Sequence, residues 1–281
     1  MRKIAMLTIA MWLMNIGMLK SQVFDATGSS RDAAFAYEVK QIDEFFERFN
    51  DVPNALIKDY IKKEKGIVPT RKSLVASLFD RNRNTWEAST IQAFMQQVLD
   101  TAKPQFAAFD SQDWYADVQC QFLYKGKPLD ITLLLNIEKD TTGGMKWMIT
   151  NVYAPGVTVV PDSLTHSKRS TRKFLNPISH ATGFIGIAKA FDEPQYLPDY
   201  VDSACLQKQI VTSVLKAAQK KELVLQQVKK VRYHFLQLPG WLFTVEYFDR
   251  PSHNAGWLIS YLEKANDPQK AAYKRKLYHE L

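Results

Sequence analysis

Two changes in the spacing of apolar residues constrain the fold of this chain most. Between residues 42 and 99 apolar side chains recur at helical spacing, and between residues 114 and 153 they alternate as they do in strands. The change is repeated later, with helical spacing from about residue 204 to 223 and alternation from 228 to 264. A chain that twice places helices before runs of strands is expected to fold as an α+β protein.

Four amphipathic helices are predicted in the first helical stretch. In the first of them apolar residues recur at positions i, i+3, i+4 and i+7, which places them on one face. The four apolar stripes begin at Ile42, Leu56, Leu74 and Ile91. The fourth helix is expected to begin at Ser89 or Thr90, because a hydroxyl group can cap the first turn of a helix.

Six strands are predicted, in two groups of three. The first group comprises "WYADVQCQFLY", "LDITLLLNIE" and "MKWMITNVY", with the turn sequence "TTGG" before the third. The second comprises "VKKVRYHFLQL", "WLFTVEYFD" and "GWLISYLEK". Each group is expected to form an antiparallel meander, with amphipathic helices packed on a bent sheet.

The two groups of strands also resemble each other. The stretch 118–122 (VQCQF) aligns with 231–235 (VRYHF), and 147–149 (WMI) aligns with 257–259 (WLI). An internal duplication of a helix-plus-three-strand unit explains this pattern. The alternative is that any two meanders look alike, because aromatic and β-branched residues favour strands.

A helix laid across a bent antiparallel sheet that ends in a strand such as "GMKWMITNVY" or "GWLISYLEK" resembles the NTF2-like and cystatin-like α+β folds. The whole chain, with its N-terminal segment and "LNPISHATGF", is similar to exported proteins of Bacteroides-type bacteria. The resemblance implies a cone-shaped sheet that can hold a pocket. It implies no particular chemistry, because NTF2-like proteins include isomerases, hydrolases and pure binding modules.

The N-terminus is typical of an export signal. Two basic residues precede an apolar run from Ile4 to about Leu19, and cleavage is expected near Ser21. Residues 1–21 are therefore interpreted as a signal peptide and residues 22–36 as a flexible lead-in. The alternative is an uncleaved anchor helix, although the run is shorter than the roughly 20 apolar residues of a membrane span. The expected location is the periplasm or cell envelope of a Gram-negative bacterium.

The net charge bears on the partners of the protein. The full chain carries a formal charge of +8, and loss of residues 1–21 removes three basic residues and no acidic ones, which leaves +5. Nucleic-acid binding requires a strong basic face, so a nucleic-acid partner is not expected. After cleavage no transmembrane span is expected either.

The remaining chain is predicted to consist of two halves and two basic segments. Residues 37–156 form the first helix-plus-meander half, and residues 174–265 form the second. Residues 157–173 are a basic linker, and residues 266–281 are a basic C-terminal tail or short helix. The run "HSKRSTRK" in the linker is either a solvated connection or a site for a polyanion such as lipopolysaccharide.

His180 is the first candidate for a catalytic residue. Asn176 and Pro177 fit the start of a helix, on which His180 shares an apolar face with Phe184 and Ile187. One interpretation is a structural histidine that packs near the start of this helix. The other is a general base at the mouth of a pocket, because the pKa of imidazole lies near neutrality.

Neither a metal site nor a cofactor site is indicated. The histidines have no HxH, HxxxH or HExxH spacing, and Cys120 and Cys205 form no CxxC pair. We therefore expect no metal and no cofactor. The two cysteines either form a disulfide in an oxidising compartment or stay separate as buried thiols.

Carboxylates on the predicted strands are further candidates. Glu246 alternates with Thr244 and Phe248 and is expected to face the concave side of the sheet, where burial can turn a carboxylate into a base. The alternative is a carboxylate that faces solvent. The other strand carboxylates are Asp113, Asp117, Asp130 and Glu138.

Aromatic side chains offer a different kind of site, because they give a large contact area to a sugar or a peptide. They can equally belong to the core. The aromatic candidates are Trp114, Tyr115, Trp241, Tyr247, Phe248 and Trp257.

The sequence thus favours a non-catalytic binding protein of the bacterial envelope. Its ligand is expected to be a small molecule, a glycan or an envelope protein. The alternative is an NTF2-like enzyme that uses His180 or a strand carboxylate such as Glu246 as general base.

Overall fold

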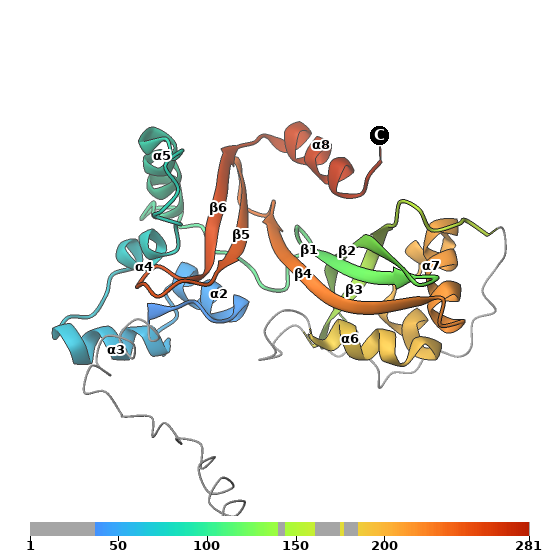
Figure 1. The fold of residues 1–281 in the computed structure, drawn as a ribbon. Helices are drawn as coiled ribbons and strands as arrows, with labels where there is room; N and C mark the ends of the chain where they lie inside the picture. The colour runs from blue at the N-terminus through green and yellow to red at the C-terminus, as the bar shows by residue number, and fades with distance from the viewer. Residues whose placement is uncertain (1–36, 140–143, 161–174, 177–184, 281) are drawn as a thin grey trace, which may run out of the picture.

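The computed structural model describes residues 37–139, 144–160, 175–176 and 185–280. Its strands form one antiparallel sheet in the order β3-β2-β1-β4-β5-β6 (Figure 1). The sheet is open at β3 and β6, and the expected α+β class is confirmed. The strands are β1 (Trp114–Tyr124), β2 (Lys127–Lys139), β3 (Met145–Tyr153), β4 (Leu223–Phe235), β5 (Trp241–Phe248) and β6 (Gly256–Lys264).

The helices fall into three groups along the chain. Before the sheet come α2 (Ile42–Asn50), α3 (Leu56–Lys65), α4 (Arg71–Ser77) and α5 (Ala88–Val98). Between β3 and β4 lie α6 (Ile185–Asp192), the 3-10 helices η2 (Pro194–Tyr200) and η3 (Cys205–Gln207), and α7 (Gln209–Gln219). The last helix, α8 (Asp267–Leu277), follows β6 and confirms the short-helix alternative for the basic C-terminal segment.

Pairing between β1 and β4 joins the two groups of strands into one sheet. Trp114 lies opposite Phe235 in this pair, and Val118 lies opposite Val231. The sheet order therefore has the first strand of each group at its centre. Val118 and Val231 are also equivalent residues in the sequence alignment of the two groups. The duplication itself, and its NTF2-like character, stay predictions.

The sheet bends at β4. This strand pairs with β1 along its whole length, but it pairs with β5 only from Arg232 to Phe235. Two register shifts in the β1–β4 pair, at Gln119/Cys120 and at Gln121/Phe122, mark bulges that increase the local twist. As a result β5 and β6 diverge from the N-terminal half of β4 (Figure 1).

Helices of each half pack on strands of the other half, and α7 packs on a strand of its own half as well. Helices α2 and α5 contact β6, while α7 contacts both β3 and β4. Single bridges reinforce this exchange, because Val39 pairs with Gly256 and Ile149 pairs with Val201. Packing therefore crosses the boundary that the sequence suggests between residues 156 and 174.

Two expected helices differ in the structure. The segment from 204 to 223 is divided into η3 and α7, because Lys208 between them is extended (φ −77°, ψ 125°). Lys221, with a φ of 56°, follows α7, and β4 begins at Leu223 rather than at Val228. The helix expected over 174–191 is wrong at its start, because Leu175 forms an antiparallel bridge with Trp147, and only its end is seen as α6.

The start of the fourth N-terminal helix is also corrected. Helix α5 begins at Ala88, after the N-cap residue Glu87, instead of at Ser89 or Thr90. The hydroxyl group of Thr90 donates to the Glu87 carboxylate at 3.2 Å rather than capping the helix.

The inner face of the sheet carries an aromatic core. Phe235 stacks on Phe243 with ring centroids 4.6 Å apart, and Trp114 stacks on Phe235 at 5.4 Å. Phe45 of α2 and Phe94 of α5 pack on Phe243. Large aromatic side chains each remove on the order of 150–250 Å² from water, so this row holds the N-terminal helices to the sheet.

Arg71 fixes the ends of two of these helices. Its guanidinium donates hydrogen bonds to the carbonyl oxygens of Phe49 at 3.1 Å and Val98 at 3.2 Å, and also to that of Gln105. Phe49 and Val98 lie in the last turns of α2 and α5, where carbonyl groups lack partners within the helix. One side chain thus anchors the C-terminal ends of both helices.

Helix α8 lies against the opposite face of the sheet (Figure 1). A small apolar cluster there includes Tyr115, Leu236 and Leu242, and Tyr273 and Leu277 of α8 pack on it. No residue of α8 is itself buried.

Gly256 is expected to be essential for docking the N-terminal segment. It has a φ of +83°, and a Cβ atom there would lie 2.2 Å from the backbone oxygen of Val39. Gly126 is a matched control, because it has a φ of +78° and open space around the same position. We expect Gly126→Ala to cost about 1 kcal/mol through its left-handed backbone alone.

Gly256→Ala is expected to cost at least about 2 kcal/mol more than the control, because the Val39 segment must move away. Urea unfolding followed by tryptophan fluorescence measures both free energies. Equal losses in the two variants would contradict the close approach.

Candidate functional site

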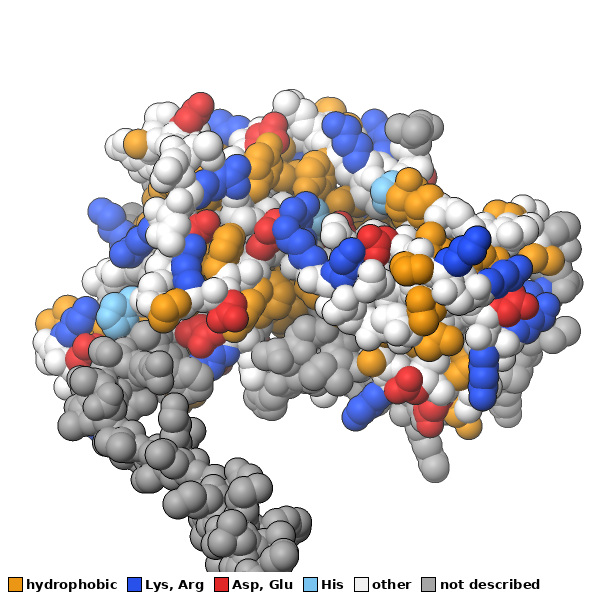
Figure 2. Space-filling model, in the orientation of Figure 1, with side chains coloured by type: hydrophobic (Ala, Val, Ile, Leu, Met, Phe, Trp, Pro, Cys, Tyr) orange, Lys and Arg blue, Asp and Glu red, His pale blue; other side chains and the backbone are white. Residues whose placement is uncertain are grey.

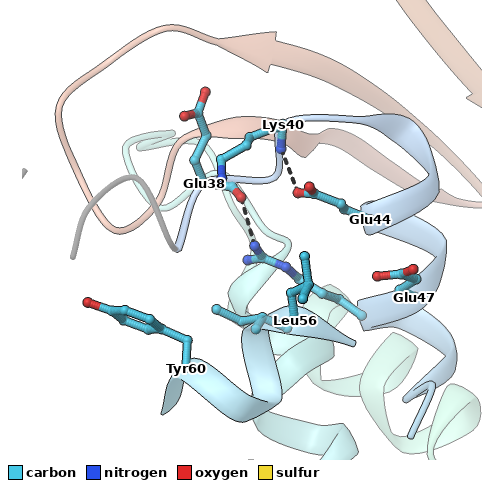
Figure 3. Close-up of a pocket in the computed structure, with 8 residues that line it drawn as sticks. Glu38, Lys40, Glu44, Glu47, Leu56 and Tyr60 are labelled. Atoms are coloured by element: carbon cyan, nitrogen blue, oxygen red, sulfur yellow. Dashed lines mark hydrogen bonds between the residues drawn. The ribbon is translucent and has the colours of Figure 1, made fainter. Parts of the chain in front are cut away.

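A cavity of about 290 Å³ lies between α2, α3 and the segment that precedes α2 (Figure 3). Ligand sites in proteins are usually concave and combine apolar walls with a few polar groups. One wall is charged and is formed by Glu38, Lys40, Glu44, Glu47 and Arg48. The other wall comes from α3 and is formed by Leu56, Ile57 and Tyr60.

Helix α2 places two of the carboxylates side by side. Its apolar stripe, which contains Phe45 and Phe49, is buried against the sheet, so the opposite face is left for polar residues. Glu44 and Glu47 are three residues apart, which puts them on neighbouring turns of one face. Figure 3 shows both extending from α2 toward the rest of the cavity wall.

Glu44 is held by the backbone. Its carboxylate accepts a hydrogen bond from the backbone N–H of Lys40 at 2.9 Å. This contact closes the start of α2, where negative charge is favourable because of the helix dipole. The carboxylate is therefore oriented before any ligand arrives.

Arg48 lies deeper in the same wall and is 3% exposed. Its two terminal nitrogens donate to the backbone oxygens of Tyr37 and Glu38, each at 2.8 Å. Burial lowers the pKa of Arg48 to about 10, although Glu44 and Glu47 oppose this effect. The guanidinium thus serves to anchor the segment before α2.

Glu44 and Glu47 both have a raised pKa. For Glu44 the main cause is burial, which outweighs the backbone hydrogen bond and the charge of Arg48. For Glu47 burial acts first, and the neighbouring charges of Asp43 and Glu44 add to it. A positive charge placed in the cavity would relieve both effects.

The apolar wall is uneven in its exposure. Ile57 is 6% exposed and packs with Ala55 and Leu74, which fixes the start of α3. Leu56 is 79% exposed at the rim of the cavity. An exposed leucine beside buried charges provides a contact for the carbon skeleton of a ligand.

A second, larger cavity of about 430 Å³ lies under the C-terminal half of α8. Tyr115, Asn136 and Thr150 line it from the sheet, and Lys274 and Tyr278 line it from the helix. Acidic and basic side chains are mixed around this cavity, so its charge does not single out one kind of ligand.

Glu246 is not the raised-pKa base that the sequence allows. Its carboxylate lies 2.9 Å from Lys230 Nζ and accepts a hydrogen bond from Arg232 Nε. Burial tends to raise its pKa, but the hydrogen bonds and charges of Lys230 and Arg232 prevail, and the pKa is lowered. Glu246 is therefore a paired carboxylate on the face of the sheet that α8 partly covers.

The aromatic candidates do not form an exposed platform. Trp114, Tyr115 and Trp241 are at most 1% exposed, and Trp257 is 6% exposed. They are buried because helices pack on both faces of the sheet. Tyr247 is exposed, and its hydroxyl group donates to the Glu38 carboxylate at 2.5 Å, next to the cavity between α2 and α3.

The other sequence candidates are dispersed. Asp113 is exposed, Asp130 pairs with Lys229 at 3.0 Å, and Glu138 pairs with Lys146 at 3.1 Å. Asp117 alone lies beside a histidine, His234, and is considered below. His180 and the basic run 166–173 lie outside the described residues.

The two cysteines remain free and buried, in agreement with the separate-thiol alternative. Burial raises the pKa of each thiol to about 12, so neither is a nucleophile at neutral pH. Within the described residues, no three His, Cys, Asp or Glu side chains are placed to share a metal ion.

Sequence reasoning missed the residues that line the first cavity. Glu44, Glu47 and Arg48 sit between the apolar positions of α2, where charged residues are usually solvated. Leu56 was expected to begin the apolar stripe of α3, but the structure leaves it 79% exposed at the rim of the cavity. Its role becomes visible only when α2 and α3 are placed together.

Charge on the visible surface is mixed. Figure 2 shows Lys and Arg side chains interspersed with Asp and Glu side chains over the described part of this face. No helix among the described residues is long and apolar enough to cross a bilayer. Comparisons with protein-family models, curated proteins and solved structures found no match to this chain.

Glu47 is expected to reduce stability at neutral pH. Its folded-state pKa lies above its unfolded value of about 4.3, so its ionisation disfavours the folded state as pH rises through that window. We expect Glu47→Gln to raise the free energy of unfolding at pH 7 and to change it little at pH 3.5. Asp59→Asn, an exposed change of the same charge on α3, is the control.

Urea unfolding at the two pH values measures this effect. A Glu47→Gln variant that is less stable than the parent at pH 7 would contradict the assignment of a destabilising carboxylate.

Proposed function

We propose that this chain is an exported, non-catalytic binding protein and that its cavity between α2 and α3 takes an organic cation. The observation that carries the proposal is the pair Glu44 and Glu47, whose pKa values are raised by burial at the wall of a cavity. Titratable groups whose pKa is shifted by burial in a cleft are candidates for a functional site.

The charge of the lining supports a cation. Three carboxylates and two basic side chains line the cavity, and the basic Arg48 is committed to two backbone carbonyl groups. A ligand with a single positive charge would balance the lining. It would also gain charge-assisted hydrogen bonds, which are roughly twice as strong as neutral ones.

The apolar wall supports a ligand with a carbon skeleton. Leu56, Ile57 and Tyr60 face the carboxylates across the cavity, so an ammonium group and an alkyl or aryl group can be bound together. A volume of about 290 Å³ suits a small amine or the side chain of a basic residue.

Among the groups that the sequence offered for catalysis, the pKa shifts of Glu246 and of the two thiols do not support a catalytic role. Glu246 has a lowered pKa, and the thiols of Cys120 and Cys205 have raised ones. General bases and nucleophiles require shifts in the opposite direction. The role of His180 as a general base stays a prediction.

Binding of isopentylammonium at pH 7.5 is the direct test. NMR titration is expected to shift the signals of Ile57 and Tyr60, while isopentanol, which has the same carbon skeleton without the charge, binds at least about tenfold more weakly. The double variant Glu44→Gln, Glu47→Gln is expected to lose at least about tenfold in affinity for the ammonium, and Asp59→Asn is expected to keep it.

Two outcomes would refute the cation site. One is equal binding of isopentylammonium and isopentanol. The other is unchanged ammonium affinity in the double variant.

Export is proposed from the charged and apolar N-terminus. We expect the full chain, expressed in a Gram-negative host, to appear in the periplasm with a mass that corresponds to loss of residues 1–21. Intact-mass spectrometry of the periplasmic fraction measures this. An uncleaved chain in the membrane fraction would instead support the anchor-helix alternative.

A further inference from the structure

Helix α8 is attached to the sheet by a few long side chains. None of its residues is buried, and its own sequence is strongly polar. Lys270 Nζ donates to the Leu236 carbonyl oxygen at 2.7 Å, and Asn151 donates to the Tyr278 carbonyl oxygen at 2.7 Å. Helices held in this way open more readily than helices with a buried face.

The most buried polar partner of α8 is His234. This histidine lies on β4, is 2% exposed, and its Nδ1 atom forms a hydrogen bond with the Tyr273 hydroxyl group at 2.7 Å. Its neighbours in the sheet are Tyr115 on β1 and Thr244 on β5. Tyr273 therefore joins α8 to the imidazole, with ring centroids 5.7 Å apart.

The other side of the imidazole is incompletely satisfied. His234 Nε2 lies 3.9 Å from an oxygen of Asp117, which is too far for a hydrogen bond. His234 Nε2 and the second oxygen of Asp117 are buried and make no hydrogen bond within the described part of the chain. Such groups cost free energy that solvation would recover.

The charges around His234 are mixed. Asp117 on β1 and Glu246 on β5 favour a protonated ring, while Arg232 on β4 disfavours it. Tyr273 supplies a neutral hydroxyl from α8, and Glu263 on β6 lies near that hydroxyl. Burial prevails over these charges and lowers the pKa of His234, so the ring under α8 is neutral at pH 7.

The same helix covers the 430 Å³ cavity described above. Lys274 and Tyr278 form its wall on the helix side, and Tyr278 packs on Tyr115 with ring centroids 6.1 Å apart. Movement of α8 away from the sheet would therefore open this cavity and bare the apolar cluster of Tyr115, Leu236 and Leu242.

We infer that α8 is a lid over this cavity and that protonation of His234 releases it. Release lets water reach the imidazole and Asp117, so the open state binds a proton more readily than the closed state. By linkage, the closed state is most stable relative to the open state above the ordinary histidine pKa of about 6.5. Its stability relative to the open state decreases as pH falls below that value. A closed cavity at neutral pH and an open one in a mildly acidic compartment follow.

Hydrogen exchange of α8 at pH 7.5 and pH 5.5 tests the inference. After correction for intrinsic exchange rates, opening of residues 267–277 is expected to increase about tenfold at the lower pH, because each pH unit below the open-state pKa shifts the equilibrium by up to tenfold. His234→Gln is expected to abolish this increase. His279→Gln removes the other histidine near α8, whose ring stacks on Tyr153 at 3.9 Å, and is expected to retain it.

Persistence of the increase in His234→Gln, or equal protection of α8 at both pH values in the parent chain, would overturn the inference. A second measurement guards against a misfolded variant. The pKa of His234, measured by NMR titration, is expected to rise in Tyr273→Ala, because this change weakens closure of α8. An unchanged pKa of His234 in that variant would also overturn the inference that α8 is a lid.

Discussion

The pairing of β1 with β4 is the constraint on which the other parts of this fold depend. It is the one place where the two groups of strands meet within the described sheet. It also sets Trp114 beside Phe235, and so builds the aromatic row that receives the N-terminal helices. The cavity between α2 and α3 and the seat of His234 under α8 both follow from this register, because each is built on elements that the pair positions.

Arg48 and Arg71 show how charged side chains hold the backbone of the helical layer in place. Arg48 is buried and donates to carbonyl groups of the segment before α2, and the partly buried Arg71 donates to carbonyl groups in the last turns of α2 and α5. The hydrogen bonds of Arg48 hold the segment before α2, while its charge acts on Glu44 and Glu47 and opposes the effect of burial on their pKa values. The charge at the back wall of the cavity therefore lies where these two hydrogen bonds hold the Arg48 guanidinium.

Local pattern was sufficient for the strands and insufficient for the site. The strand patterns of β1, β3 and β6 predicted their ends to the residue, whereas polar Gln226 and Gln227 and the bulged pairing with β1 concealed the start of β4. The aromatic candidates favour strands because large side chains pack well on a half-buried sheet, and the same packing places them in the core. The pairs Asp117–His234 and Glu44–Leu56 are brought together by tertiary packing, which no spacing in the sequence encodes.

The packing of helices from one half on strands of the other half determines how the chain would respond to a break in its backbone. Because α2 and α5 cover β6 while α7 covers β3, each half supplies the surface that the other half must bury. A single break between β3 and α6 would therefore leave two pieces that complete each other noncovalently, in the manner of complementing fragments. Two molecules could exchange the same pieces and form an intertwined dimer with every contact of the monomer retained.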